Sequence, residues 1–172
     1  DEMEFYRING SGVQLQGVEA ELGLRFSRAE LVSGITVQSS LLDEPEPDFG
    51  ATQMFRTPDV YGSVRFGWDF TERFNLMFTT KYTGSMIVPH YAGYIEKDRL
   101  EATPEFLTFD VIASYKIPIT TDFFGAFTAG VYNITDDFQS DFDIGINRDA
   151  GYIYGPLVPR RILLGFSIGH DY

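Results

Sequence analysis

The sequence predicts an all-β protein, a transmembrane antiparallel up-and-down β-barrel. Apolar and polar residues alternate with a period of two along most of the chain, which is the pattern of half-buried strands. Aromatic residues are abundant, with 16 Phe, 10 Tyr and 1 Trp among 172 residues. Short and long connections follow one another in turn, as in a meander that carries tight turns on one rim and large loops on the other.

The pattern predicts eight strands in succession along the chain. They cover about residues 1–8, 13–27, 32–42, 59–70, 75–87, 106–117, 123–134 and 161–172. Short links are expected near residues 27–31, 71–74 and 118–122, and long loops over about 43–58, 88–104 and 136–159. Because the chain starts with Asp1 inside an expected strand, we interpret residues 1–172 as the barrel part of a longer polypeptide.

The first clear alternation lies in residues 13–27, where Val18 and Leu22 oppose Glu19 and Glu21. In residues 59–70 the apolar face includes Val60, Val64, Phe66, Trp68 and Phe70. It opposes Tyr61, Ser63, Arg65 and Asp69. Each of these segments therefore has one apolar and one polar face, as a strand between two different environments requires.

The later segments continue the alternation, with Leu76 and Phe78 opposing Thr79 and Lys81 in residues 75–87. The alternation is also clear in residues 106–117. Its apolar face is Leu107, Phe109, Val111, Ala113, Tyr115 and Ile117, and its polar face is Thr108, Asp110, Ser114 and Lys116. Residues 123–134 are apolar or small on both faces, and residues 161–172 alternate to the end.

Two environments are compatible with the apolar faces. In a soluble β-sandwich these faces would pack against each other. A membrane barrel is favoured because strands of 10–14 residues match the ~9–11 residues of a tilted membrane strand. Charged residues at mid-strand also suit a hydrated lumen, and aromatics near strand ends suit the membrane interfaces.

The composition excludes several classes of protein. No apolar run approaches the ~20 residues of a transmembrane helix. The net charge of -12 disfavours nucleic acid as a partner. The absence of cysteine excludes disulfides, thiolate metal sites and cysteine nucleophiles. No serine elbow, phosphate loop or spaced metal-ligand cluster is present, so we expect no enzyme, no cofactor and no metal site.

Three ordered segments resemble the late barrel strands of TonB-dependent outer-membrane receptors. The first is RINGSGVQLQGVEAELGLRF, with its Asn and Gly-Val-Glu strand. The second is YTGSMIVPHYAGYIEKDRLEATPEFLTFDV, with a Tyr-Thr-Gly strand end before a loop. The third is GVYNITDDFQSDFDIGINRDAGYIYGPLVPRRILLGFSI, which is similar to the family's last hairpin.

The resemblance implies about the last eight strands of a 22-stranded barrel in the cell outer membrane. The amino-terminal plug and the box that binds TonB would lie outside this chain. The implied partners are outer-membrane lipid, the plug and remaining strands, the TonB complex, the barrel assembly machinery and a small nutrient chelate. The implied function is import of a scarce nutrient, and we favour a metal chelate such as a ferric siderophore, haem or cobalamin.

Three groups of residues are candidates for functional roles. Met86, His90, Tyr91 and Tyr94 gather soft, imidazole and aromatic groups that suit contact with a metal chelate. Tyr91 and Tyr94 are equally compatible with an aromatic rim, and His90 with a hydrogen bond inside the loop. Glu19, Glu21, Lys81, Asp110 and Lys116 are expected to face the lumen. Ile162, Leu164, Phe166, Ile168 and Tyr172 resemble the carboxy-terminal assembly signal of outer-membrane barrels, from which His170 departs.

The acidic run DDFQSDFDIGINRD contains Asp136, Asp137, Asp141 and Asp143, but its spacing does not match a calcium loop. We therefore expect a solvated acidic loop, with weak binding of a divalent ion as the alternative. Two other functions remain open. One is a stand-alone eight-stranded outer-membrane barrel with a structural or adhesion role, and the other is a secreted β-sandwich that serves as a binding module.

Overall fold

The computed structural model describes residues 12–170, which form nine strands. Seven of them are long: β1 (Val13–Arg25), β2 (Ala29–Leu42), β3 (Val60–Asp69), β4 (Phe74–Thr83), β7 (Phe106–Pro118), β8 (Phe123–Tyr132) and β9 (Arg161–His170). Two are short, β5 (Ile87–His90) and β6 (Arg99–Ala102). Within residues 12–170, no helix has the length and apolar character needed to cross a membrane.

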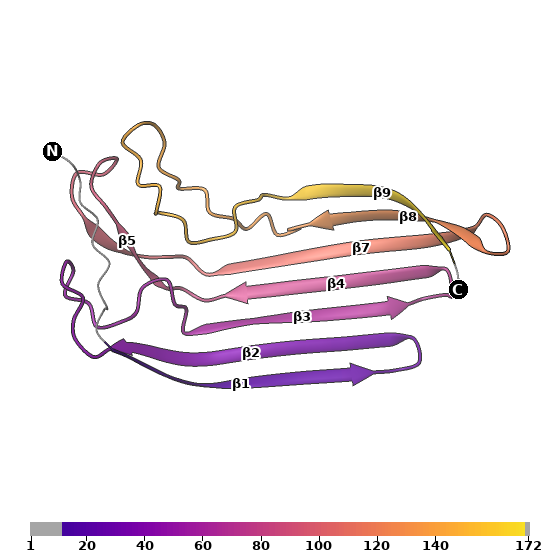
Figure 1. Cartoon of the computed structure of the whole chain (residues 1–172), viewed down its shortest axis with the longest axis horizontal. Helices are drawn as coiled ribbons and strands as arrows, with labels where there is room; N and C mark the ends of the chain where they lie inside the picture. The colour runs from indigo at the N-terminus through magenta and orange to yellow at the C-terminus, as the bar shows by residue number, and fades with distance from the viewer. Residues whose placement is uncertain (1–11, 171–172) are drawn as a thin grey trace.

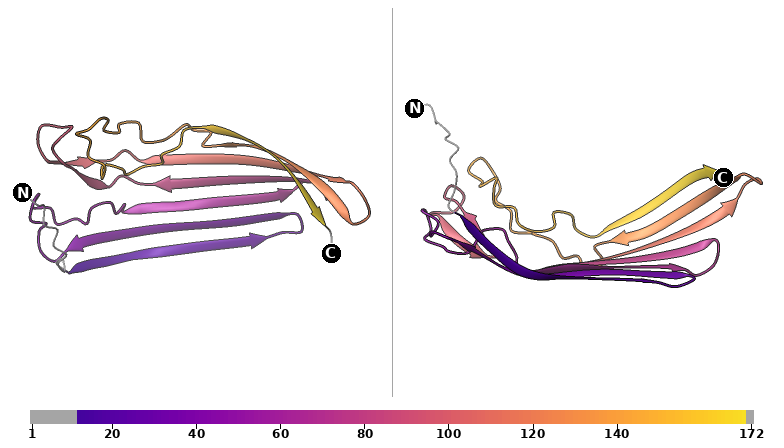
Figure 2. Two further views of the ribbon diagram at one scale, coloured as in Figure 1. Left: turned by 45° about the horizontal axis from the view of Figure 1, so that its top comes forward. Right: turned by 60° about the horizontal axis from the view of Figure 1, so that its bottom comes forward.

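The long strands form one curved, single-layered antiparallel sheet in the order β1-β2-β3-β4-β7-β8-β9 (Figures 1 and 2). No second sheet covers either face in the described part of the chain, so the β-sandwich alternative is wrong. β1 and β9 lie at opposite edges and do not contact each other, so the sheet is not closed. This open, curved sheet is what a portion of a wider barrel looks like.

The observed strands follow the predicted ones with shifts at their ends. β2 begins at Ala29 instead of residue 32, and β4 ends at Thr83 instead of residue 87. The expected strand at residues 1–8 lies outside the described residues. The β5–β6 hairpin was not predicted, because four-residue strands are too short to show an alternation.

The two rims of the sheet differ as the connection lengths predicted. Residues 26–28, 70–73 and 119–122 make tight turns at one end (Figure 1). In two of these turns a threonine hydroxyl accepts backbone N–H groups: Thr71 from Arg73 and Phe74, and Thr120 from Asp122 and Phe123. Such local side-chain bonds stabilise turns without larger packing. Residues 43–59, 84–105 and 133–160 gather at the opposite end.

The register places all apolar faces on one side of the sheet. Directly paired residues share a face, and one line of pairs crosses all seven long strands: Leu24, Leu31, Phe66, Phe78, Val111, Val131 and Ile162. This apolar face includes Val18, Leu22, Ile35, Val64, Trp68, Phe78, Val111, Phe127, Leu164 and Phe166. Phe66, Phe78 and Phe109 stack across β3, β4 and β7 with centroid distances of 6.1 and 6.4 Å.

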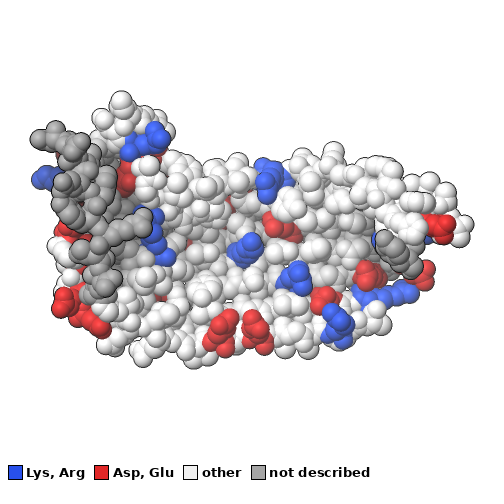
Figure 3. Space-filling model, viewed as in Figure 1, with Lys and Arg blue, Asp and Glu red and all other residues white. Residues whose placement is uncertain are grey.

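The same register places every Asp, Glu, Lys and Arg of the seven long strands on the other face. These residues are Glu19, Glu21, Arg25, Glu30, Arg65, Asp69, Lys81, Asp110, Lys116 and Arg161. This charged face is the concave side of the sheet, and both signs of charge are spread over it (Figures 2 and 3). A sheet with one purely uncharged face suits contact with lipid on that side and water on the other.

Candidate functional site

The long loops pack into a folded body, which we call the loop body and define as residues 43–59, 84–105 and 133–160. Met86, Val88 and Tyr152 form its buried apolar cluster, and Tyr154 packs against them. Val88 is fully buried in β5. These contacts join the β5–β6 hairpin to residues 133–160, so the loops have a fixed shape despite lying beyond the sheet.

His90 at the end of β5 is buried and bridges two carboxylates. Its Nδ1 lies 3.2 Å from Glu101 Oε1, and its Nε2 lies 3.0 Å from Asp143 Oδ2. The imidazole also stacks on Tyr152 with a centroid distance of 3.7 Å. Because both ring nitrogens face carboxylate oxygens, a ring that is protonated on both nitrogens satisfies both contacts. The bridge therefore connects β6 and residues 133–160 through one side chain.

Glu101 is also held by Arg99 on the same strand, with 2.7 Å between Arg99 Nε and Glu101 Oε1. Burial alone would raise the pKa of Glu101. The hydrogen bonds from Arg99 and His90 outweigh burial and leave this pKa below its ordinary value. Glu101 is thus an anion at neutral pH, as the bridge requires.

Two tyrosines share the carboxylate of Asp141. Tyr152 donates its hydroxyl to Oδ2 at 3.1 Å, and Tyr154 donates to Oδ1 at 2.7 Å. Burial, together with the charge of Asp141 and the hydrogen bond to it, raises the pKa of Tyr152 to about 12. The pKa of Tyr154 is raised by burial and the same carboxylate. Both hydroxyls therefore remain protonated donors over a wide pH range.

Gln139 and Arg56 bind backbone atoms of residues 151–154, Gln139 from within the same loop and Arg56 from the first loop. The fully buried Gln139 amide donates to the Tyr152 carbonyl and accepts from the N–H of Tyr154. Arg56 donates to the carbonyls of Gly151 and Ile153 at 2.6 and 2.8 Å. Because Arg56 lies in residues 43–59, this contact fixes the first loop against the last one.

The four predicted ligand-contact residues fall into two environments. Met86 and His90 are 7% and 4% exposed and belong to the interior of the loop body. Tyr91 and Tyr94 are 41% and 51% exposed at its surface. The N–H of Tyr91 donates to Asp149 Oδ2 at 3.1 Å, and its ring lies 5.8 Å from that of Phe49. The structure thus places the tyrosines, and not Met86 or His90, where an external ligand could touch them.

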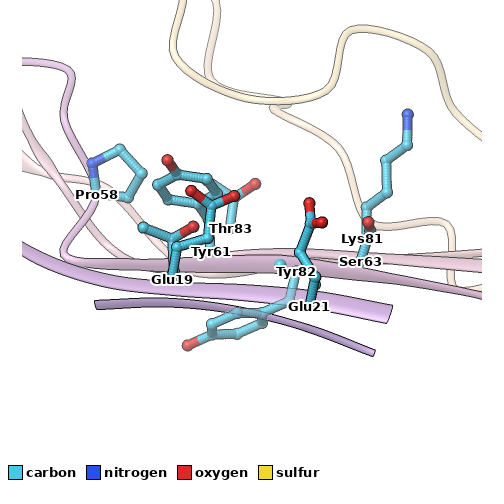
Figure 4. Close-up of a pocket in the computed structure, with 11 residues that line it drawn as sticks. Glu19, Glu21, Pro58, Tyr61, Ser63, Lys81, Tyr82 and Thr83 are labelled. Carbon is cyan, nitrogen blue, oxygen red and sulfur yellow. The ribbon is translucent and has the colours of Figure 1, made fainter. Parts of the chain in front are cut away.

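The five charged residues predicted to face the lumen all lie on the charged face. Glu19, Glu21 and Lys81 line a hollow on it, and Figure 4 shows these three on one side of the strands and Tyr82 on the other. Within residues 12–170 the five form no ion pair with one another.

Two of these five charged residues make other contacts. Asp110 accepts the N–H of Asn133 at 2.7 Å, where the last loop begins. Lys116 lies over the ring of Phe124, with its Nζ 4.6 Å from the ring centroid. Asp110 therefore has a local structural role, whereas Glu19, Glu21 and Lys81 present their charge to the concave side.

Four residues of the predicted assembly signal lie on the apolar face of β9. Ile162, Leu164, Phe166 and Ile168 are all more than half exposed. Tyr172 lies outside the described residues. His170 stands at the end of the same face, with its ring 4.9 Å from that of Phe123. The imidazole thus makes an edge-to-face contact with an aromatic ring at the turn rim, with 81° between the ring planes.

The acidic run is solvated only in part: Asp136 and Asp141 are exposed as expected, whereas Asp143 is buried. Asp136 accepts the N–H of Arg160 and Asp137 accepts that of Leu107. Asp143 is 8% exposed and accepts from His90 and from the N–H of Asp149. Among residues 12–170, no group of three or more His, Asp or Glu side chains is arranged to hold a metal ion. Sequence reasoning missed these acceptors because their donors are distant in sequence.

Comparisons with known proteins agree with this geometry. The family model described as TonB dependent receptor-like, beta-barrel matches residues 2–134. The chain therefore belongs to the β-barrel family of TonB-dependent receptors. No curated protein matches the chain.

A similar solved structure is the ferripyoverdine receptor of the outer membrane of Pseudomonas aeruginosa, bound to ferripyoverdine, with a TM-score of 0.64 and 18% identity. The match covers 91% of this chain and 19% of that receptor. At this identity the likeness shows the fold. The chain spans a small part of the receptor's length, and both matches support the predicted carboxy-terminal portion of such a barrel.

Proposed function

We propose that this chain is part of an outer-membrane receptor that imports a metal chelate, either a ferric siderophore, haem or cobalamin. The observation that carries the proposal is the division of the sheet into an uncharged face and a charged concave face, with a folded loop body on one rim. Membership of the TonB-dependent receptor family supports transport in place of catalysis. The fold likeness to a receptor bound to ferripyoverdine supports a metal chelate.

In this proposal the apolar face contacts outer-membrane lipid and the edges of β1 and β9 pair with the remaining barrel strands. The charged face lines the lumen and contacts the amino-terminal plug, and Glu19, Glu21 and Lys81 are the groups available for that contact. The TonB complex drives movement of the plug from the other side of the barrel. The assembly machinery recognises β9. An open sheet edge in lipid would leave backbone N–H and C=O groups unpaired, which is why the other strands are needed.

The loop body forms part of the external binding surface. Tyr91 and Tyr94 contact the chelate directly, because their rings are exposed. Met86 and His90 hold the hairpin that carries Tyr91 in place. In this proposal the ligand-contact role predicted from sequence is kept for Tyr91 and Tyr94, and Met86 and His90, which are buried, support the site instead of touching the ligand.

The test is uptake of radiolabelled ferric siderophore, haem and cobalamin by cells in which the full-length receptor is the sole candidate importer. Uptake of one of these chelates is expected, and it should stop when TonB is deleted. Replacing both tyrosines (Tyr91→Ala with Tyr94→Ala) should weaken chelate binding while the loop body stays folded. Replacing the support (Met86→Ala with His90→Ala) should lower uptake and also unfold the loop body. Uptake of a glycan but of no metal chelate would contradict the proposal.

A further inference from the structure

Three aromatic rings meet on the outer surface of the loop body and come from two different loops. Phe49 lies between Phe55 and Tyr91, with centroid distances of 5.9 and 5.8 Å. Phe49 and Phe55 are half-buried and Tyr91 is 41% exposed. We call these three residues the aromatic patch. Exposed aromatic groups of this kind are typical of binding surfaces, since their rings offer large, rigid contact area.

Four carboxylates surround Tyr91. Burial raises the pKa of its hydroxyl first, and the negative charges of Asp48, Glu46, Asp149 and Asp98 raise it further. Within residues 12–170 none of these four takes part in an ion pair. The aromatic patch therefore lies in a field of uncompensated negative charge.

Hydrogen bonds hold three of the four carboxylates, those of Glu46, Asp98 and Asp149, in place without neutralising them. Glu46 accepts the N–H groups of Asp48 and Phe49, and Asp98 accepts the N–H of Ala92. Asp149 accepts the N–H groups of Tyr91 and Gly151 at 3.1 and 2.7 Å. Backbone N–H groups are dipoles, so each carboxylate keeps its full negative charge.

The side-chain cation Arg56, which lies in the same loop as Phe49 and Phe55, does not cancel this charge. Its guanidinium donates to the carbonyls of Gly151 and Ile153 and holds the two loops together. It forms no ion pair with the carboxylates around Tyr91 in the described part of the chain. The charge left over around the aromatic patch is therefore negative.

An aromatic face attracts a cation through its quadrupole, and Tyr is one of the effective rings for this contact. Neighbouring carboxylates add a Coulomb attraction and repel anions. We propose that the aromatic patch binds a cationic organic group, an ammonium or a guanidinium, carried by the nutrient chelate. This inference rests on the proposed import function and adds a charge class to its ligand, excluding anionic chelates from close contact at this surface.

The experiment uses three small probes of similar size on the purified full-length receptor: phenyltrimethylammonium, benzyl alcohol and benzoate. Saturation-transfer NMR in deuterated detergent measures weak binding of each. We expect the cation to bind roughly fivefold or more tightly than the neutral alcohol, as a partly exposed cation–π contact with added Coulomb attraction gives. Benzoate should bind least, and rising salt should weaken binding of the cation. Equal binding of cation and alcohol would overturn the proposal.

Variants at two positions show whether the cation binds at the aromatic patch. Tyr91→Leu removes a ring and should lower cation binding several-fold, whereas Tyr91→Phe keeps the ring and should retain it. Asp48→Asn should weaken binding and Asp48→Glu should not. Glu44→Gln, which removes a carboxylate of the same loop outside the group around Tyr91, is the matched control and should have no effect. Cation binding that is unchanged in both Tyr91→Leu and Asp48→Asn would place it elsewhere and overturn the assignment.

Chelate uptake separates failure of this inference from failure of the proposed function. Uptake of a metal chelate by a receptor without cation preference at the aromatic patch would remove the inference and leave the import function intact. Cation binding at the patch in a receptor that imports no metal chelate would remove the import proposal and keep the binding site.

Discussion

The sheet and the loop body are stabilised in opposite ways. In the sheet, large apolar side chains such as Leu164 and Ile162 are 79% and 76% exposed. Its strands are held by backbone ladders and by cross-strand pairs. In the loop body, Val88 and Gln139 are fully buried, and buried polar groups such as His90 have partners.

This difference indicates what each region needs from its surroundings. The sheet has no core of its own, so its apolar face has to be covered by something outside the chain, and lipid fits its uncharged surface. The loop body has its own apolar cluster and hydrogen-bond network, as a region surrounded by water requires. A single chain thus contains one part built for lipid and one part built for water.

The largest effect is expected from a charge placed on the apolar face. Val111→Lys should cost about 2–4 kcal/mol if the side chain lies near the middle of the membrane. Its neighbour Ile112 lies on the charged face, so Ile112→Lys is the matched control and should be tolerated. The amount of folded receptor in the outer membrane and its urea unfolding measure both. An equal loss of folded receptor in Val111→Lys and Ile112→Lys would contradict the assignment of one face to lipid and the other to water.

The loop body should respond to loss of its buried bridge while the sheet does not. His90→Ala leaves Asp143, whose side chain is 2% exposed, without the hydrogen bond from the imidazole. Removing the hydrogen-bond partner of a buried acceptor costs about 1–3 kcal/mol, and more for a charged group. Amide hydrogen exchange of the full-length receptor should become faster in β5 and β6 and stay unchanged in β3 and β4. Ile146→Ala, at a side chain that is 97% exposed, is the control and should change neither region.

Alkaline pH should also loosen the loop body before the sheet. Burial and Asp141 raise the pKa of Tyr152 from 10.0 to about 12, so the folded state holds this proton more tightly than the unfolded state. The resulting stability is complete below pH 10 and is lost as the pH rises through about 12. Tyrosinate absorbance should show this late step, and Tyr152→Phe should remove it. If Tyr152 ionises at the ordinary pKa of tyrosine instead, the buried contact with Asp141 would be contradicted.

The smallest effect is expected at the exposed ion pair of the charged face. Arg25 and Glu30 are 3.1 Å apart, with side chains 81% and 44% exposed. Exposed pairs contribute about 0.2–1 kcal/mol, so Arg25→Ala and Glu30→Ala should barely change the free energy of unfolding. A double-mutant cycle would measure the coupling. A coupling of several kcal/mol would show that this face is shielded from water.

The sheet could be predicted from sequence because its information is local. Alternation within each segment, as at Asp110 and Val111, places every second residue on one face whatever lies beyond. The β5–β6 hairpin could not be predicted, since its four-residue strands show no period and Pro89 lies in β5. Burial of Val88 and its neighbours depends on contacts with residues 133–160.

The candidate site shows the same limit. Tyr91 and Tyr94 were identified by residue type, and their exposure agrees with a role at the surface. The buried role of Asp143 could not be recognised, because its partner His90 lies 53 residues earlier. Phe49 was missed for the same reason, since its neighbour Tyr91 comes from another loop. Contacts between residues of different loops depend on how the whole chain folds. The sequences of the loops alone do not predict them.

The central claim is that one face of the sheet contacts lipid and the other contacts water. The chain has no cysteine, so single cysteines at residues 107–114 of β7 can carry a spin label in the full-length receptor once any cysteine elsewhere in it has been replaced. The label's accessibility to oxygen, which concentrates in lipid, and to a water-soluble nickel chelate is then measured. We predict oxygen maxima at Leu107, Phe109, Val111 and Ala113, and nickel maxima at the residues between them. Equal accessibility along the whole series, or nickel maxima at Phe109 and Val111, would contradict the account.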